Sequence, residues 1–306
     1  LVAVSKFHPI EKIKEVYGNN AWPIESAKDV DDLIRLKENE GFATYLRIIY
    51  LPKLILVDKD AHADSSFHLA QELYEKYNVG KIRLKFSLSR ATSNSLEQVP
   101  GADSVNSEDV VLGLYEGFKK FQDLHPDFDF VLSPSFRKEP SQFDSSKYAT
   151  RKEHFEAQVD EIVRLTDRFP FLARYMTDVD TVGSENDLYR KEHFNEFQKG
   201  FRKLQYRGFK IRSHHGETFY TLKKGIQAVD NAMNIWHIDT LEHGLSLGIN
   251  PNFYFHRLYQ NVLAKNKKGI GIAKGDPEYR ELIELDWGNS KNVLEKLLEG
   301  KSINPE

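Results

Sequence analysis

The 306-residue sequence contains no cysteine. Disulfide bonds and metal sites built from thiolates are therefore excluded, and the composition fits a cytoplasmic protein. No apolar run approaches the roughly 20 residues that a membrane-spanning helix needs, so we expect no membrane partner. The formal net charge of −3 argues against a nucleic-acid duplex held by bulk positive charge.

Three common catalytic motifs are also missing. The sequence has no Gly-x-Ser-x-Gly nucleophile elbow, so acyl transfer by serine has no support. It has neither a P-loop nor the glycine-rich fingerprint of a dinucleotide-binding fold. The last two absences favour a closed barrel over an open, doubly wound sheet.

Strand-like and helix-like segments alternate along the chain. Strands are predicted over 81–86, 128–132, 171–176, 209–215, 235–243 and 270–272, and helices of amphipathic spacing lie between them. This alternation implies a parallel sheet with helical crossovers. We predict a single barrel domain over 1–306, of the (β/α)8 type, without its first and last strands. Long polar loops are predicted at about 88–106 and 134–149.

Two strand ends carry the most informative residues. One ends in Ser-His-His-Gly-Glu, which contains His214 and Glu217, and the next ends in Glu-His-Gly, which contains His243. The carboxyl ends of parallel strands meet at one rim, so we expect these three side chains to lie together. A lone histidine at a strand end is more often only a polar residue than a ligand. Here Gly216 permits a sharp turn that brings the glutamate to the same rim.

These strand ends resemble the adenosine/AMP deaminase family of the amidohydrolase superfamily, in which the fifth strand ends in His-Ala-Gly-Glu and the sixth in His-Gly. A third match lies upstream, where Asp180, Gly183 and Glu185 form the pattern Asp-x-x-Gly-x-Glu. The resemblance extends over about residues 45–265 and rests on these three motifs in the same order.

The resemblance implies zinc-dependent hydrolytic deamination of an adenine nucleoside or nucleotide to the inosine form. It assigns zinc to His214, proton transfer to Glu217, and orientation of the attacking hydroxide to His243. It assigns contacts with the purine to Asp180 and the backbone of Gly183. His215 stands where the family has alanine, which leaves open which histidine of the pair would bind the metal.

The chain also departs from the family. It contains no His-x-His pair, and its only adjacent aspartates are Asp31-Asp32, in an early helical segment. We expect that the sequence is an incomplete portion of a larger enzyme. The alternative is a degenerate barrel without metal that serves as a binding or scaffold subunit.

Long loops are a further point of similarity. Relatives with extended loops include the deaminase subunit of the bacterial RADAR antiphage system, a large homo-oligomer that acts on adenosine and its phosphates. This resemblance implies that the chain could form a homo-oligomer. Arg137-Lys138 in the second loop could meet a substrate phosphate, although solvated loop charges are the simpler interpretation.

Overall fold

The computed structural model describes residues 13–14, 17–38, 40, 44–45, 48, 56, 58–88, 105–139, 142–185 and 188–284. The chain divides into two compact units, each described by itself below. One consists of Leu1–Asp180 with Lys203–Phe209, and the other of Thr181–Arg202 with Lys210–Glu306. No helix among the described residues is both long and apolar enough to cross a membrane.

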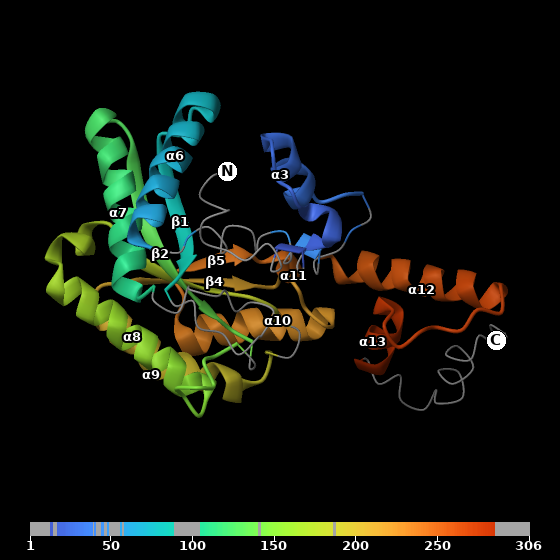
Figure 1. Ribbon diagram of the computed structural model, residues 1–306. Helices are drawn as coiled ribbons and strands as arrows, with labels where there is room; N and C mark the ends of the chain where they lie inside the picture. The colour runs from blue at the N-terminus through green and yellow to red at the C-terminus, as the bar shows by residue number, and fades with distance from the viewer. Residues whose placement is uncertain are drawn as a thin grey trace. The chain divides into compact units, whose positions relative to one another are not determined.

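Five strands lie within the described residues, and Figure 1 shows them as arrows. They are β1 (Lys81–Ser87), β2 (Asp129–Arg137), β3 (Asp178–Val182), β4 (Lys210–His215) and β5 (Thr240–His243). Their order in the sheet is β1-β2-β3-β4-β5, the same as in the sequence. The β1–β2 and β4–β5 pairs are parallel. The predicted α/β class with a parallel sheet is thus confirmed, whereas closure into a barrel stays a prediction.

Helices precede the first strand, separate the strands and follow the last one. They are η1 (Asn19–Ala21), α3 (Ala27–Ile34), α6 (Lys59–Tyr77), α7 (Ser107–Leu124), α8 (Arg151–Arg168), η4 (Pro170–Arg174), α9 (Lys191–Tyr206), α10 (Leu222–Asn231), η5 (Ala232–Trp236), α11 (Leu245–Gly248), α12 (Pro251–Lys267) and α13 (Pro277–Glu284).

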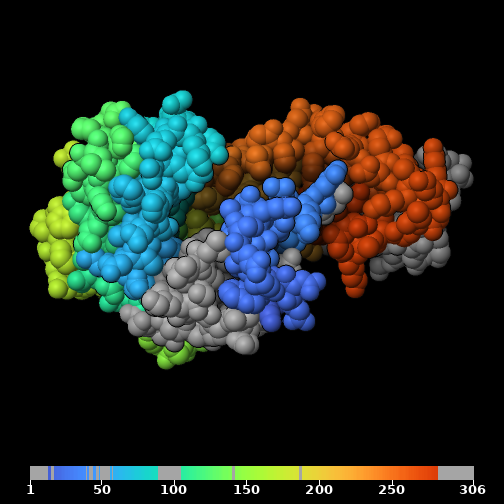
Figure 2. All heavy atoms as spheres, turned by 45° about the horizontal axis from the view of Figure 1, so that its top comes forward, coloured from blue at the N-terminus to red at the C-terminus, as the bar shows by residue number. Residues whose placement is uncertain are grey.

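In the first unit, α6 and α7 pack side by side, as Figures 1 and 2 show. Asn106 caps α7 by accepting the N–H of Asp109. The spacing of apolar residues in α7 buries Phe118 and Phe121 on one face. Gly117 allows the close approach, because a Cβ there would stand 2.0 Å from the carbonyl oxygen of Ala63. The two helices therefore pack tightly against each other, and α7 also contacts β2.

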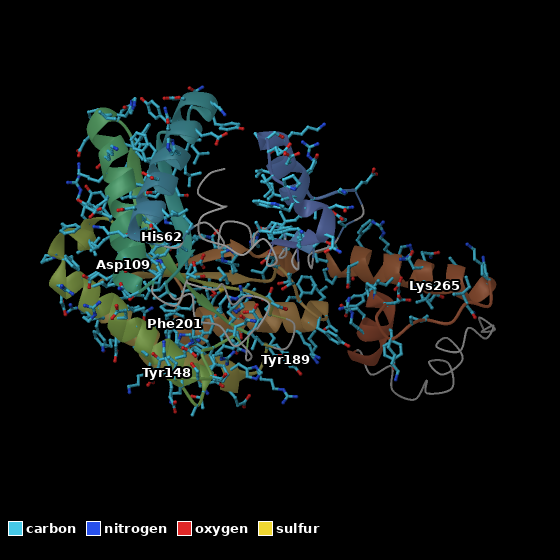
Figure 3. All side chains as sticks on the ribbon, in the orientation of Figure 1. His62, Asp109, Tyr148, Tyr189, Phe201 and Lys265 are labelled. Carbon is cyan, nitrogen blue, oxygen red and sulfur yellow. The ribbon has the colours of Figure 1, made fainter. Side chains whose placement is uncertain are left out.

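Helix α8 carries a buried histidine near its start. The Nδ1 atom of His154 accepts the backbone N–H of Asp144 at 3.2 Å. The His154 ring also stacks on Tyr148, which Figure 3 labels, with 4.8 Å between ring centroids. Burial lowers the pKa of His154, with a smaller opposing effect from Asp144. His154 thus acts as a neutral hydrogen-bond acceptor in this unit.

The core of the second unit is aromatic. Trp236 is surrounded by Phe194, Phe197 and Phe201 at centroid distances of 4.6–5.5 Å. The indole N–H donates to the carbonyl oxygen of Phe194 at 2.7 Å. The start of α10 is held by Glu281, whose carboxylate accepts the N–H of Leu222 at 2.7 Å. The strands that carry the candidate site rest on this core.

Several predicted elements differ from the structure. The predicted strand over 171–176 is wrong, because Pro170 begins the 3-10 helix η4 there and the strand follows at Asp178–Val182. Residues 235–236 end the π-helix η5, so β5 is confined to Thr240–His243. Residues 270–272 form no strand.

One of the two predicted loops begins later than predicted, and the other lies mostly outside the described residues. Strand β2 continues through Pro134 to Arg137, so the second polar loop begins later than the predicted residue 134. Most of the first loop, over 89–104, lies outside the described residues. The single barrel domain over 1–306 stays a prediction beside the two compact units.

Candidate active site

Strand β4 places its two terminal histidines on opposite faces. Successive side chains of a strand alternate, and burial along β4 alternates accordingly. His215 is fully buried, and its Nδ1 lies 2.6 Å from the hydroxyl of Ser213, which also bonds to Thr181. Its ring packs on Phe194, with centroids 5.4 Å apart. Of the histidine pair, only His214 is on the half-exposed face.

His214 lies beside His243 at the end of the neighbouring strand. The two ring centroids are 4.9 Å apart. In the parallel β4–β5 pair, His214 is opposite Glu242 and His215 is opposite His243, so the two rings come from neighbouring positions of adjacent strands. His243 departs from strand geometry with a φ of 67°. The two imidazoles therefore form an adjacent pair at the carboxyl ends of β4 and β5.

Glu217 completes this cluster. Its Oε1 atom lies 3.6 Å from Nε2 of His243. The glutamate side chain is 28% exposed and that of His243 is 42% exposed, so both groups are open to solvent. The structure thus brings the three predicted residues to one rim. A carboxyl group and two imidazoles at this spacing can exchange protons with a small polar molecule.

Two turns with positive φ hold the cluster. Gly216 has a φ of 70°, and His243 and Gly244 follow with 67° and 64°. A Cβ at Gly216 would stand 2.6 Å from Oγ of Ser246 and 3.3 Å from the carbonyl carbon of Gly244. The turn after β4 is therefore packed directly on the turn after β5. Only glycine fits at 216.

A buried carboxylate fixes the turn that carries Glu217. Glu185 is 2% exposed. Its Oε2 accepts the N–H of Gly216 at 2.9 Å, and its Oε1 accepts the N–H groups of Glu217 and Thr218. In return, the hydroxyl of Thr218 accepts the N–H of Glu185 at 3.3 Å. The sequence pattern contained Glu185, but sequence reasoning gave it no role.

The two predicted substrate contacts lie upstream. Asp180 is fully buried in β3, and its carboxylate pairs with Nζ of Lys85 from β1 at 2.9 Å. Gly183 directly follows β3 and has a φ of 101°, a conformation that favours glycine. Asp180 therefore has a structural partner in the first unit. Substrate contacts by Asp180 and Gly183 stay predictions.

Arg137 and Lys138, the residues considered for binding a substrate phosphate, lie at the end of β2 and just after it. The guanidinium of Arg137 donates to the carboxylate of Glu139 at 3.1 and 2.9 Å. Lys138 is 1% exposed. Arg137 is therefore paired and Lys138 is buried, contrary to the expectation of solvated loop charges. A phosphate-binding role for this pair receives no support from these contacts.

The described residues do not fit a protein-held zinc ion. His214 and His243 are adjacent, but no three histidine, aspartate or glutamate side chains among the described residues form a group that could hold a metal. A catalytic zinc needs about three protein ligands. Among the described residues at the ends of β4 and β5, the two imidazoles and the carboxyl of Glu217 are groups that could act on a substrate.

The fold is similar to that of a deaminase of known structure. The crystal structure of an adenine deaminase from Arthrobacter aurescens matches with a TM-score of 0.50 and 12% sequence identity, over 88% of this chain and 68% of that chain. At this identity the likeness concerns the fold alone. No protein-family model matches the sequence. A search of curated proteins likewise finds no match.

Proposed function

We propose that this protein is a hydrolase that releases ammonia from a purine ring bearing an amino group, with an adenine nucleoside or nucleotide as its substrate. The observation that carries the proposal is the convergence of His214, Glu217 and His243 at the carboxyl ends of adjacent parallel strands. The fold shared with an adenine deaminase supports it. A complete (β/α)8 barrel belongs to the same proposal.

Hydrolytic deamination needs a proton donor and a proton acceptor, which a carboxyl group and an imidazole can provide. Water adds to the ring carbon that bears the amino group. The amino group then takes up the proton of the new hydroxyl and leaves as ammonia when the carbon–nitrogen bond breaks, and the hydroxyl oxygen becomes the carbonyl of the product. Glu217 donates a proton to the neighbouring ring nitrogen, which makes the carbon electrophilic. His243, 3.6 Å from this carboxyl, orients the water and accepts its proton. The resemblance implied zinc on His214, but the described residues do not supply the roughly three ligands that a catalytic zinc needs, so no step here depends on it.

The test is ammonia release from adenine, adenosine and AMP, measured with a coupled glutamate dehydrogenase assay. Glu217→Gln should lower the turnover rate by roughly 10²- to 10⁴-fold, because the variant loses a general acid. Glu192→Gln is the matched control, since Glu192 is exposed on α9 in the same unit and its loss should leave turnover unchanged.

Two results would contradict the proposal. Equal turnover in the wild type and in Glu217→Gln would remove this carboxyl from the mechanism. No ammonia from any of the three compounds would overturn the hydrolase and favour the binding or scaffold subunit. Circular dichroism of each variant should match the wild type, so that a loss of activity is not a loss of fold.

A further inference from the structure

Glu185 is an unusual buried charge. Four of its hydrogen bonds go to the turn over 216–218, three accepted by the carboxylate and one donated by the backbone N–H. Its backbone carbonyl oxygen accepts the N–H of Leu188 at 3.0 Å. Within the described part of the chain, no lysine, arginine or histidine forms an ion pair with it. A buried carboxylate without a cation is costly unless hydrogen bonds replace its hydration. Here three consecutive backbone N–H groups do so.

The same bonds determine the geometry of the turn. Three successive N–H groups that point to one carboxylate leave the backbone of Gly216, Glu217 and Thr218 little freedom. Each of these N–H groups would lose its partner if the carboxylate moved. The side chain of Glu217 leaves from the middle of the three. Its direction toward His243 is therefore set by a residue 32 positions upstream.

We propose that Glu185 is the positioning residue for Glu217, which it holds at 3.6 Å from His243 by clamping the backbone on both sides. The inference rests on the proposed function, in which Glu217 is the general acid. Glu185 touches no reacting atom in this scheme, because its carboxylate is buried and its oxygens face the turn. In this proposal, the glutamate of the Gly-x-Glu pattern that begins at Gly183 links the segment after β3 to the turn after β4.

The test compares Glu185→Gln with Glu281→Gln. Glu281 is also buried in the second unit, and its carboxylate accepts the N–H of Leu222 and the hydroxyl of Tyr254, both outside the turn over 216–218. A glutamine at 185 keeps one acceptor oxygen and turns an amino group toward backbone donors. We expect kcat to fall about 10²-fold, the effect of a small displacement of a catalytic group. KM should change little, since the acid acts in the transition state.

A second measurement does not depend on activity. Amide hydrogen exchange of the peptide over 213–220 should be at least several-fold faster in Glu185→Gln than in Glu281→Gln. If the wild type releases no ammonia, the proposed function fails, but exchange still tests the clamp. Equal exchange in both variants would overturn it. A loss of kcat in Glu281→Gln as large as in Glu185→Gln would also overturn it, because that result indicates only general destabilisation.

Thr218 provides variants without a buried charge change if Glu185→Gln does not fold. Thr218→Val removes the hydroxyl that accepts the N–H of Glu185, and Thr218→Ser restores it. We expect a lower kcat in the valine variant and recovery in the serine variant. Wild-type kcat in Thr218→Val, together with unchanged exchange over 213–220, would contradict the clamp.

Discussion

Replacement of Gly216 by alanine tests the packing of the two turns that hold the site. The substitution has two costs. An alanine at a φ of 70° is in the left-handed region, which costs about 1–2 kcal/mol. The new methyl group would also overlap Oγ of Ser246 at 2.6 Å, with further tight contacts at 3.2 Å to Val229 and 3.3 Å to Gly244. Such overpacking adds about 1–3 kcal/mol.

Gly269→Ala separates the two costs. Gly269 belongs to the same unit and has a φ of 64°, but a Cβ there would meet nothing within 4 Å. Its replacement should therefore show the backbone cost alone. We expect Gly216→Ala to reduce the free energy of unfolding by about 1–3 kcal/mol more than Gly269→Ala does. Each kcal/mol corresponds to roughly 2–8 °C in Tm over the range of sizes that includes this unit.

Ser246→Ala sharpens the comparison. The Ser246 hydroxyl is buried without a hydrogen-bond partner among the described residues, so its removal should cost little. In this background Gly216→Ala should be less destabilising, because the shortest overlap is gone. Thermal unfolding followed by circular dichroism measures the wild type, the three single variants and the double variant. Equal Tm losses in Gly216→Ala and Gly269→Ala would refute the proposed packing of the two turns.

Two further predictions concern metal content and pH. The purified chain should contain far less than one zinc per molecule, because no three potential ligands converge among the described residues. Inductively coupled plasma mass spectrometry measures the zinc content, and a stoichiometric amount would contradict this prediction. His154 should make the first unit acid-sensitive, because burial lowers the pKa of His154 in the folded protein below the ordinary 6.5. The stability that the neutral histidine contributes is therefore complete above pH 6.5 and is lost as the pH falls through the pKa of the folded protein. His154→Asn, which keeps an acceptor without the titration, should show a smaller drop in Tm below pH 6.5 than the wild type, and an equal drop would count against this cause.

The predictable part of the site follows from strand geometry. His214, Glu217 and His243 each lie at or just after the end of a strand, and neighbouring parallel strands end at the same edge. The local sequence pattern was therefore sufficient to predict that these three side chains lie close together. The side-chain alternation of β4 also separates His214 from His215, once the strand is known to continue through both residues.

The unpredicted part depends on partners that are remote in sequence. Strand β3 contains Asp178 and Asp180, whose buried carboxylates are compensated by Arg83 and Lys85 of β1. Taken without these partners, residues 178–182 have the composition of a polar loop, whereas the apolar run over 171–176 is typical of a strand. The role of Glu185 depends likewise on backbone N–H groups 31–33 residues away. No local pattern identifies such acceptors.

The left-handed backbone at His243 has an evolutionary consequence. A non-glycine residue with a φ of 67° gives up conformational energy that glycine or asparagine would recover at this position. Selection for thermal stability alone would therefore replace this histidine and discard the imidazole at the rim. Retention of His243 in homologues that share this turn would mark selection for chemistry, since stability favours its loss.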